Sequence, residues 1–596
     1  MMAWIPVVLL AVPLLGALML LIAPRALHPV LRPYGLILSA VTLAASLVLV
    51  AAFDYGRPAA IQYELDLPWV PGLGMRFHLG VDGISLPLIT LTALLTFLCF
   101  VYLCWGRGTA REFMNARPRA LVFTLLVLEV GMIGTFLALD LLLFFVFFEI
   151  VLIPMYFLIG IWGGDGRRAA SVKFILYTLL GSVVMLLGLL LVWAQAGTLD
   201  IVALNASHGA GMSRSVQILA FVAIGAGLAV KTPMWPLHTW LPDAHTEAPT
   251  VGSVLLAGVL LKMGTYGFAR IAIPVLPEGA EAAAPWLGAF AVVGIVYGAL
   301  ACLAQRDLKR MIAYSSIGHM GFVLLGFATL TPVGTNGALF ANVAHGLITG
   351  LLFFLAGAIK ERHHTADMPA LGGGLLARLP RLGSLLTFAA IASLGLPGLA
   401  GFWGEMLALL GAFQPADALP RGLFLTYMVI GGLGAVLTAA YFLVMLSRVT
   451  HGRPRAADEA ETGPAADTAT DAATDTGAGA VTGSGGGAAI AVAERTDAGL
   501  SPGATTDVAE RADAALSPGS TTGVAERTDA LPPDATTGVA GRTDAALPPG
   551  ATIDVKPNEW LAWTPLVVLT LLFGLWPGLL LSLTTPPVQA LLGALS

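Results

Sequence analysis

Apolar runs of about 20 residues recur along this 596-residue chain and constrain its fold more than any other feature. A helix of that length crosses a bilayer, because it rises about 1.5 Å per residue and the hydrocarbon core is about 30 Å thick. Only 11% of the residues are charged, against about 25% in soluble domains. Backbone groups in lipid must be hydrogen-bonded within the chain, which a helix achieves. The sequence therefore predicts an all-α integral membrane protein.

About fourteen runs are predicted to cross the membrane, and the positive charges between them indicate an orientation. If the N-terminus faces outside, the inside loops carry 19 Lys and Arg residues and the outside loops carry 5. Cytoplasmic loops hold an excess of these residues, so the split favours this orientation and this number of helices. Both termini are therefore expected outside. The predicted spans are 2–23, 30–53, 81–105, 119–137, 140–162, 172–194, 215–232, 250–272, 286–304, 312–329, 337–359, 382–402, 424–447 and 561–582.

The segment 456–552 differs in composition from the rest of the chain. It consists largely of Ala, Thr, Gly, Asp and Pro, has no aromatic residue, and repeats units such as VAERTDAGLSPGATTD and VAERADAALSPGSTTG. Repeats can indicate a solenoid, but this segment lacks the large apolar side chains that a stacked core needs. We expect a disordered cytoplasmic insert.

Two charged side chains interrupt apolar runs and are candidates for chemistry. Glu149 lies in DLLLFFVFFEIVLIPMYFLIGIWGG, a run that opens with Asp140, itself a secondary candidate. Lys262 interrupts VGSVLLAGVLLKMGTYGFAR and has no neutralising residue near it in sequence. A charge at mid-bilayer costs at least about 3 kcal/mol, so such residues usually serve a function. The alternatives are a glutamate that faces a polar bundle interior and a structural lysine.

Lys231 lies beside a predicted helix break. It opens KTPMWPLHTWLPDAH, whose three prolines cannot continue a helix without losing backbone hydrogen bonds. Broken helices that carry a lysine often form ion sites in transporters. The alternative is a lysine at a helix end that extends to the membrane surface. His238 and His245 follow in the loop, as proton relays or as ordinary loop residues.

His319, His345 and Glu405 are the corresponding candidates in the second half of the chain. The histidines lie in YSSIGHMGFVLLGF and NVAHGLITGLLFFLAG, where imidazole can pass protons near neutral pH or can simply pack. Glu405 follows a break rich in proline and glycine, SLGLPGLAGFWGEML. Glu149 and Lys231 are 82 residues apart, and His319 and Glu405 are 86 apart. An offset of roughly 170 residues with five helices in each unit predicts an inverted repeat.

The chain shows no pattern for a redox centre or a nucleotide site of its own. Its three cysteines, Cys99, Cys104 and Cys302, form no CxxC motif or Cys/His cluster, so no iron–sulfur, haem or zinc site is expected. No Walker loop is present, and no GxGxxG joins a strand to a helix. Energy for ion movement is therefore expected from other proteins.

These motifs resemble a known family, the antiporter-like membrane subunits of respiratory complex I, and most closely its M (subunit 4) type. The resemblance extends from about residue 77 to residue 449, with a weaker match around the last helix. The matching stretches are FHLGVDGISLPLITLTALLT, DLLLFFVFFEIVLIPMYFLIGIWGG, VKFILYTLLGS, KTPMWPLHTWLPDAHTEAPT, LKMGTYGFAR, YSSIGHMGFV and GLPGLAGFWGEM.

The resemblance implies an antiporter-like fold of fourteen helices with two inverted five-helix repeats that contain broken helices. It also implies that one hydrophilic axis comprises Glu149, Lys231, Lys262, His319, His345 and Glu405. Glu405 stands where L-type, N-type and sodium–proton antiporter subunits typically have lysine. The expected divisions are N-terminal helices (1–118), a first repeat (119–272), a second, inverted repeat (273–449), the insert (450–556) and a C-terminal transmembrane helix (557–596).

The implied function is proton translocation as a non-redox subunit of NADH–quinone oxidoreductase, in the inner (cell) membrane of a bacterium. FMN, iron–sulfur clusters and quinone are expected in partner subunits, with no cofactor or metal in this chain. The expected partners are the flanking L-type and N-type subunits, the lipid bilayer and protons, and not nucleic acid.

In the hypothetical mechanism, Lys262 lies at the centre and can hold a proton, and Lys231 pairs with Glu149 in one state and loses this counter-ion in the next. The proton of Lys231 then passes by water and His319 or His345 toward Glu405. Three alternatives remain: a subunit of a multi-chain sodium–proton antiporter, a subunit of a hydrogenase or formate-oxidising complex, and a structural membrane scaffold.

Overall fold

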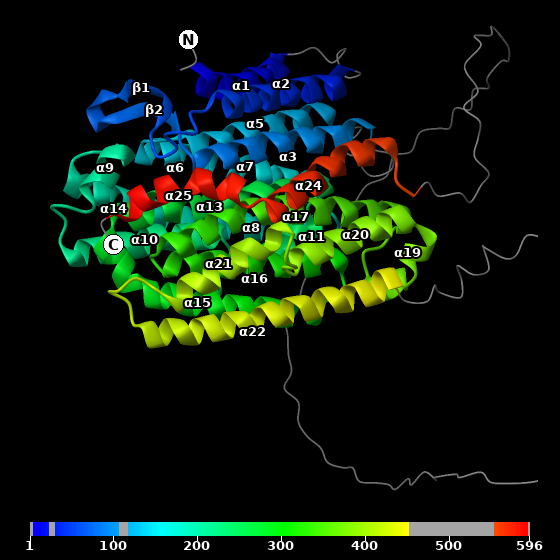
Figure 1. Ribbon diagram of the computed structural model, residues 1–596. Coiled ribbons are helices and arrows are strands. Elements are labelled where there is room, and N and C mark those ends of the chain that lie inside the picture. The colour runs from blue at the N-terminus through cyan, green and yellow to red at the C-terminus, as the bar shows by residue number, and fades with distance from the viewer. Residues whose placement is uncertain (1–3, 23–29, 106–116, 452–553, 594–596) are drawn as a thin grey trace, which may run out of the picture. The chain divides into compact units, whose positions relative to one another are not determined.

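The computed structural model describes residues 4–22, 30–105, 117–451 and 554–593, which are mostly helical (Figure 1). In this part, 13 helices are long and apolar enough to cross a membrane. The insert 456–552 and its predicted disorder lie outside the described residues. The spans are α1 (Ile5–Ile22), α2 (Leu31–Ala52), α3 (Ser85–Trp105), α5 (Pro118–Leu137), α6 with α7 (Leu141–Ile150, Leu152–Trp162), α8 (Arg167–Ala196), α10 (Arg214–Lys231), α12 to α14 (Thr250–Val275), α15 (Pro277–Leu303), α16 (Leu308–Ala328), α17 (Pro332–His363), α22 (Arg421–Leu446, extended to His451) and α24 (Pro557–Leu575).

The remaining predicted span, 382–402, is wrong as a continuous helix. The structure has two 14-residue helices here, α20 (Pro380–Ser393) and α21 (Ala400–Phe413). Between them Gly395 and Gly398 have φ angles of +81° and +94°, which glycine adopts without the penalty of a side chain. Pro397 removes a backbone donor between these glycines. The span is therefore a broken helix like the one that follows Lys231.

The C-terminal segment also differs from its prediction, which was a single span over 561–582. The structure has α24, which ends at Leu575, and a second apolar helix, α25 (Gly578–Leu592). Pro577 lies between them and cannot donate the hydrogen bond that a continuous helix would need there.

One feature departs from the all-α prediction, an antiparallel hairpin of β1 (Gln62–Val70) and β2 (Met75–Val81). Its register pairs Leu65 with Leu79 and Pro68 with Arg76, with a bulge on either side. Shorter helices lie between the spans: α9 (Ile201–Ser207), α11 (Trp240–Glu247), α18 (Met368–Leu371) and α19 (Leu375–Arg378).

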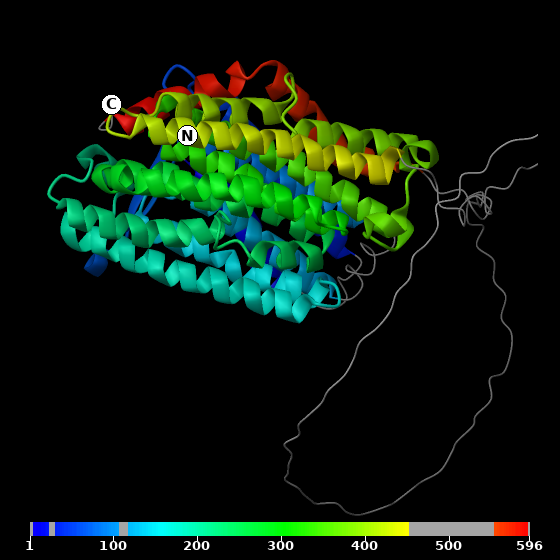
Figure 2. The same cartoon turned by 90° about the horizontal axis from the view of Figure 1, so that it is seen from below.

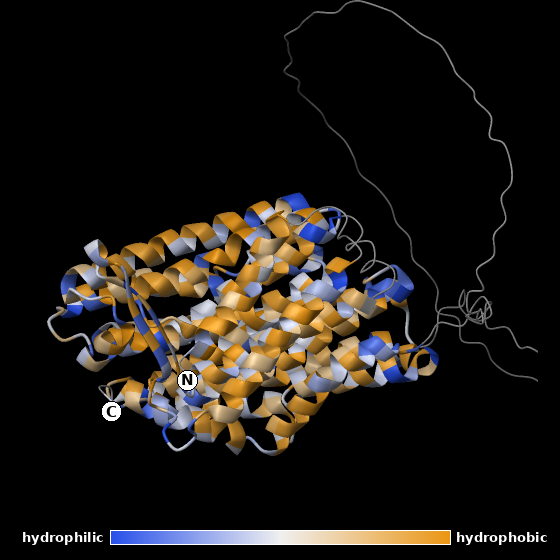
Figure 3. Ribbon diagram, turned by 90° about the horizontal axis from the view of Figure 1, so that it is seen from above, coloured by the Kyte–Doolittle hydropathy of each residue, from blue (hydrophilic) through white to orange (hydrophobic). Residues whose placement is uncertain are grey.

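The helices lie side by side in one bundle, with hydrophobic residues along their middles and hydrophilic residues at their ends (Figure 3). The helix Thr250–Val275 lies at the centre of the bundle. All residues in its apolar 18-residue stretch are buried, whereas only 28% of the residues in the corresponding stretch of α2 are buried. The helix α8 runs along one edge of the bundle (Figure 2). It exposes large apolar side chains such as Leu180 and Leu187. A rim of this kind is stable in lipid, so the chain is a multi-pass membrane protein.

Two pairs of backbone contacts recur at the same interval along the chain. An isolated bridge joins Asp140 to Asp200, and another joins Asp307 to Asp367. Each aspartate also caps a helix through its side chain, and corresponding members of the two bridges lie 167 positions apart. Five described spans separate the start of α6 from the start of α16, so the second bridge lies at the opposite end of the bundle if each span crosses once. This arrangement is that of an inverted repeat.

Candidate functional site

Glu149 lies where the span Leu141–Trp162 is interrupted between α6 and α7. Pro154 has no backbone N–H, so it cannot donate the helical hydrogen bond to the carbonyl oxygen of Ile150. The helix α6 ends at Ile150. The Glu149 side chain is partly buried, and its Oε1 has no hydrogen-bond partner among the described residues. The carboxylate thus lies beside a helix break, not within a continuous helix.

Lys231 is the last residue of α10 and is buried. The predicted break after it is confirmed, because the next helix, α11, begins at Trp240. The Lys231 Nζ donates to the carbonyl oxygen of Phe148 at 3.3 Å and lies 4.3 Å from the centroid of the Phe148 ring. In the described part of the chain, no ion pair joins Lys231 to Glu149. The amine instead contacts the residue directly before Glu149.

Lys262 is fully buried in the central helix, between two π-helical turns at Leu256–Leu260 and Phe268–Ala272. Its Nζ lies 2.5 Å from the carbonyl oxygen of Ala257 and 2.6 Å from Nδ1 of His345. A π-helical turn shifts the backbone pairing and often marks a functional position. Lys262 therefore has a carbonyl and an imidazole as its hydrogen-bond partners, and no carboxylate of the described residues forms an ion pair with it.

His345, His319 and Glu405 continue from Lys262 as one line of contacts. The rings of His345 and His319 lie edge to face, with centroids 5.6 Å apart. His319 Nδ1 lies 3.2 Å from Glu405 Oε1, and its Nε2 lies 3.0 Å from Ser393 Oγ. Glu405 itself packs over the break between α20 and α21, where a Cβ on Gly395 would come within 2.9 Å of its Oε2. The glycine thus leaves room for the carboxylate.

A small cavity of about 20 Å³ lies between these side chains. His319, His345 and Glu405 line it together with Ser393 and Thr349. Within the described residues, His345 Nε2 and Thr349 Oγ1 have no hydrogen-bond partner. A cavity of this size has room for one water molecule, and these two polar atoms are candidates to bind it.

His238 and His245 each pack against an aromatic ring. His238 packs edge-on against Tyr297 with ring centroids 4.9 Å apart. His245 is fully buried and stacks on Phe353 at 4.5 Å, and neither of its ring nitrogens has a partner among the described residues. Lys309 was not among the predicted site residues, because it lies between the predicted spans 286–304 and 312–329. Lys309 is buried and donates to Ala248 O at 2.7 Å.

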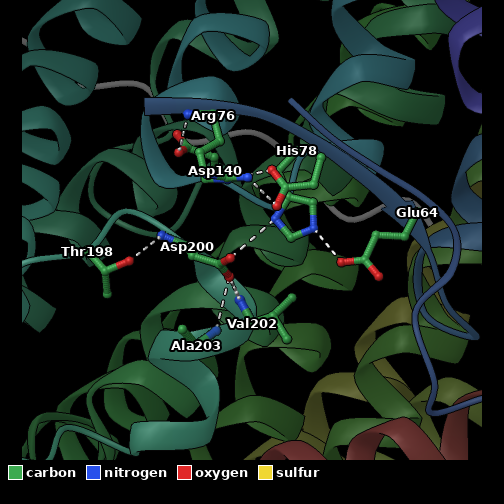
Figure 4. A network of polar contacts seen from close by, with 9 residues as sticks. Glu64, Arg76, His78, Asp140, Thr198, Asp200, Val202 and Ala203 are labelled. Carbon is green, nitrogen blue, oxygen red and sulfur yellow. Dashed lines mark hydrogen bonds and ion pairs between the residues drawn. The ribbon is translucent and has the colours of Figure 1, made fainter. Parts of the chain in front are cut away.

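Asp140 does not join the line from Lys262. Its Oδ1 accepts from the backbone N–H groups of Leu142 and Leu143 at 3.0 Å each and so caps α6. Its Oδ2 accepts from the N–H of Arg76 at 3.1 Å, which ties α6 to the hairpin (Figure 4). The contacts of Asp140 are thus those of a helix cap.

His78 lies beside this cap, between two carboxylates (Figure 4). Its Nε2 lies 2.8 Å from Glu64 Oε1, and its Nδ1 lies 3.4 Å from Asp200 Oδ2. Burial lowers the pKa of His78, but the two carboxylates outweigh burial and raise it overall. Burial acts to raise the pKa of Asp200, yet contact with His78 and with the N–H groups of α9 lowers it.

Two further buried charges were missed by the sequence analysis. Glu129 lies in the middle of α5, fully buried, and neither of its carboxylate oxygens has a partner in the described part of the chain. A glutamate inside the run LVFTLLVLEVGMIGTFL was a signal that the sequence did contain. Arg270 lies at the end of the predicted span 250–272, where it was counted among the outside positive charges, and is buried against Asp82 at 2.6 Å.

Comparisons with known proteins agree with this fold and with these motifs. A family model described as "NADH:quinone oxidoreductase/Mrp antiporter, TM" matches residues 138–434. NADH-quinone oxidoreductase subunit M of Rhodobacter capsulatus is 43% identical over 454 residues, which cover 74% of this chain and 85% of the relative. NADH-ubiquinone oxidoreductase chain 4 of Arabidopsis thaliana is 40% identical over 445 residues, with 74% and 86% covered.

Solved structures share the same architecture. A chain of respiratory complex I from Thermus thermophilus matches with a TM-score of 0.73 and 27% identity, and 100% of each chain is covered. A chain of the Mrp complex from Dietzia sp. matches with a TM-score of 0.70 at 20% identity, covering 99% of this chain and 98% of the other, which shows the fold alone. The predicted antiporter-like fold and family resemblance are confirmed. The chain belongs to the family of antiporter-like M (chain 4) membrane subunits of NADH–quinone oxidoreductase.

Proposed function

We propose that this chain translocates protons along the line Lys262–His345–His319–Glu405 and carries no redox group of its own. The contact between Lys262 Nζ and His345 Nδ1 at 2.6 Å is the observation that carries the proposal. It brings a buried amine from the central helix against an imidazole from α17, so a proton can pass between two spans. The cavity beside His345, His319 and Glu405 supplies the place for a water molecule across the gap between the imidazoles.

Protons would reach Lys262 from the side of Lys231. Lys231 contacts the carbonyl of Phe148, directly before Glu149, and both residues lie at helix breaks. A shift of the Glu149 carboxylate toward or away from Lys231 would change the stability of the lysine's charge. This is the step at which a neighbouring subunit can act electrostatically on the chain.

The partners follow from the relatives. Those relatives are named as subunits of NADH-quinone and NADH-ubiquinone oxidoreductases, and the Thermus thermophilus chain belongs to respiratory complex I. This chain would assemble with other membrane subunits, L-type and N-type on its flanks, in a bacterial cell membrane. FMN, the iron–sulfur clusters and quinone would lie in partner subunits and supply the electron-transfer chemistry.

The excess of Lys and Arg supports an orientation with the hairpin and both termini outside. Loops that share a side with Arg306 and Arg310 carry most of the positive charge. The bridge Asp307–Asp367 would then lie on the cytoplasmic side, and Asp140–Asp200 on the outer side.

Substitution of Glu405 tests the proposal. Glu405→Gln should lower the proton gradient produced by NADH oxidation in inverted vesicles, because an amide cannot carry the proton. Glu405→Asp should lie between Gln and the wild type, and Glu405→Lys should do less harm than Gln, because a lysine can also bind and release a proton. Glu281→Gln, on α15 and outside the line, is the matched control.

Amounts of the assembled complex are compared by immunoblot so that losses of assembly are separated from losses of transport. Normal pumping by Glu405→Gln would remove Glu405 from the path. A Lys variant much worse than Gln would contradict its role as the terminal proton carrier.

A further inference from the structure

A second polar cluster lies on the same helix as Lys262, toward the end that carries the hairpin. Tyr266 and Arg270 follow Lys262 at intervals of four residues, so they lie near one face of the helix. Eight residues correspond to a rise of about 12 Å. Tyr266 is fully buried and Arg270 is 4% exposed, so both lie within the protein core. They lie between Lys262 and the C-terminal end of this helix.

Asp82 closes this cluster from the loop before α3. Its Oδ1 lies 2.6 Å from Nη2 of Arg270, and Asp82 is 1% exposed. The same oxygen accepts the backbone N–H groups of Ile84 and Ser85 at 3.1 and 3.0 Å. The carboxylate thus binds one guanidinium and two backbone donors at once.

Tyr266 connects Arg270 with the adjacent helix α5. Arg270 Nε donates to the Tyr266 hydroxyl at 3.2 Å, and this hydroxyl donates to the carbonyl oxygen of Phe136, also at 3.2 Å. The Phe136 and Tyr266 rings pack edge to face with centroids 5.2 Å apart. Hydrogen bonds and apolar packing therefore surround the tyrosine.

None of these three groups can readily relay a proton. A guanidinium holds its protons across the physiological pH range. Protonation of Asp82 would break a buried ion pair and leave the charge of Arg270 uncompensated. The Tyr266 hydroxyl already uses its single proton in the bond to Phe136. The cluster therefore differs from the His345–His319–Glu405 line, whose imidazoles and carboxylate can exchange protons.

We propose that Arg270, Asp82 and Tyr266 form a proton-inert seal at the outer end of the Lys262 helix. The seal rests on the proposed function, because it matters only if Lys262 carries protons. It forces a proton on Lys262 to leave through His345 and prevents direct exchange with the outer medium. Without such a seal, protons that were pumped outward could return through Lys262, and the gradient would be lost.

One group of the seal, the carboxylate of Asp82, can become able to bind a proton when its ion pair with Arg270 is lost. If Arg270 is replaced by an apolar residue, Asp82 keeps its two backbone donors but loses the guanidinium that balances its charge, and loss of a counter-ion favours the protonated form of a buried carboxylate. It would then become a proton-exchanging group between Lys262 and the outer surface. The two halves of the ion pair are thus unequal: loss of Arg270 creates a proton carrier, whereas loss of the Asp82 charge does not.

This asymmetry defines the experiment. The purified complex is reconstituted in liposomes, a pH gradient is imposed without NADH, and its decay is followed with a trapped pH-sensitive dye. Arg270→Met should accelerate the decay severalfold. Asp82→Asn should not, because it leaves only a guanidinium and an amide, and the double variant Arg270→Met/Asp82→Asn should be as tight as the wild type.

A leak in Arg270→Met should also disappear when Lys262→Met is added, because the route then lacks its inner end. Three results would each overturn the seal. The pH gradient could decay no faster in Arg270→Met than in the wild type, it could decay equally fast in Asp82→Asn, or the fast decay could persist when Lys262→Met is added. If Arg270→Met does not assemble, Arg270→Gln takes its place, because its amide can still donate to Asp82 yet provides no positive charge. The decay is measured without electron transfer, so a failed seal and a failed Glu405 test are separate results.

Discussion

The helix α24 is held at one end by a buried ion pair whose strength can be estimated. Arg362, at the end of α17, lies 2.6 Å from Glu559 Oε2, and their side chains are 6% and 3% exposed. The same carboxylate oxygen accepts the N–H of Lys556 at 2.8 Å. At the other end of α24, the carbonyl of Gly574 accepts the indole N–H of Trp403 from α21, the helix that carries Glu405. Loosening α24 would therefore loosen the support of Glu405.

Glu559→Gln breaks this ion pair with little change in volume. The Arg362 guanidinium would keep two carbonyl partners, Ala358 and Asp554, at 3.1 and 3.0 Å, but would lose the one carboxylate that forms an ion pair with it among the described residues. Breaking a buried ion pair from one side costs about 3–5 kcal/mol. Each step of about 1.4 kcal/mol changes an equilibrium constant about tenfold. The population in which the start of α24 has detached should therefore rise at least about 100-fold.

Hydrogen–deuterium exchange of the intact complex measures this population, because local opening limits amide exchange. Amides in the first turns of α24 should lose protection by about two orders of magnitude in Glu559→Gln. The control is Asp54→Asn, which breaks the exposed pair with Arg57 and should change local protection by less than about tenfold. Protection within about threefold of the wild type in Glu559→Gln would refute the estimate, because the pair would then contribute no more than a surface pair.

Three other predictions address the path, the insert and the hairpin. Glu149→Gln should reduce both proton pumping and coupled electron transfer in vesicles while complex amounts stay normal; unchanged pumping would leave Glu149 a structural role only. Deletion of residues 456–552 should leave assembly and pumping nearly intact, and loss of the complex on native gels would show that the segment binds elsewhere in it. For His78, the raised pKa means that its pairing with Asp200 and Glu64 stabilises the fold fully below about pH 6.5 and loses this effect as pH rises through the raised value. The Tm difference between wild type and His78→Gln should accordingly shrink as the pH rises above about 6.5, and a constant difference would contradict the assignment.

The membrane spans were largely predictable from the sequence because each satisfies a local requirement. A run of about 20 apolar residues must form a helix in lipid whatever its neighbours are. The span 382–402 was wrong as one continuous helix, although the break predicted before Glu405 is confirmed. Hydropathy does not reveal the left-handed backbone angles of Gly395 and Gly398 that make the break. The prediction also missed the hairpin, because the strands 62–70 and 75–81 lie outside the apolar runs on which it was based.

The candidate residues were predictable for the same local reason, since an ionisable group in an apolar run is expensive unless it has a partner. Lys262, His345 and Glu405 stood out on this ground, and Glu129 should have. Arg270 did not stand out, because it lies near a span boundary, where a positive charge is ordinary.

Only the tertiary structure decided which of these groups touch. Lys262 meets His345 across 83 positions of sequence, and His319 meets Glu405 across 86. The structure also placed Lys231 on the carbonyl of Phe148 and buried Arg270 against Asp82. Hydropathy is a property of single segments and fixes where a helix crosses the membrane. Contacts between side chains depend on the rotation and depth of several helices at once, which packing of the whole bundle sets.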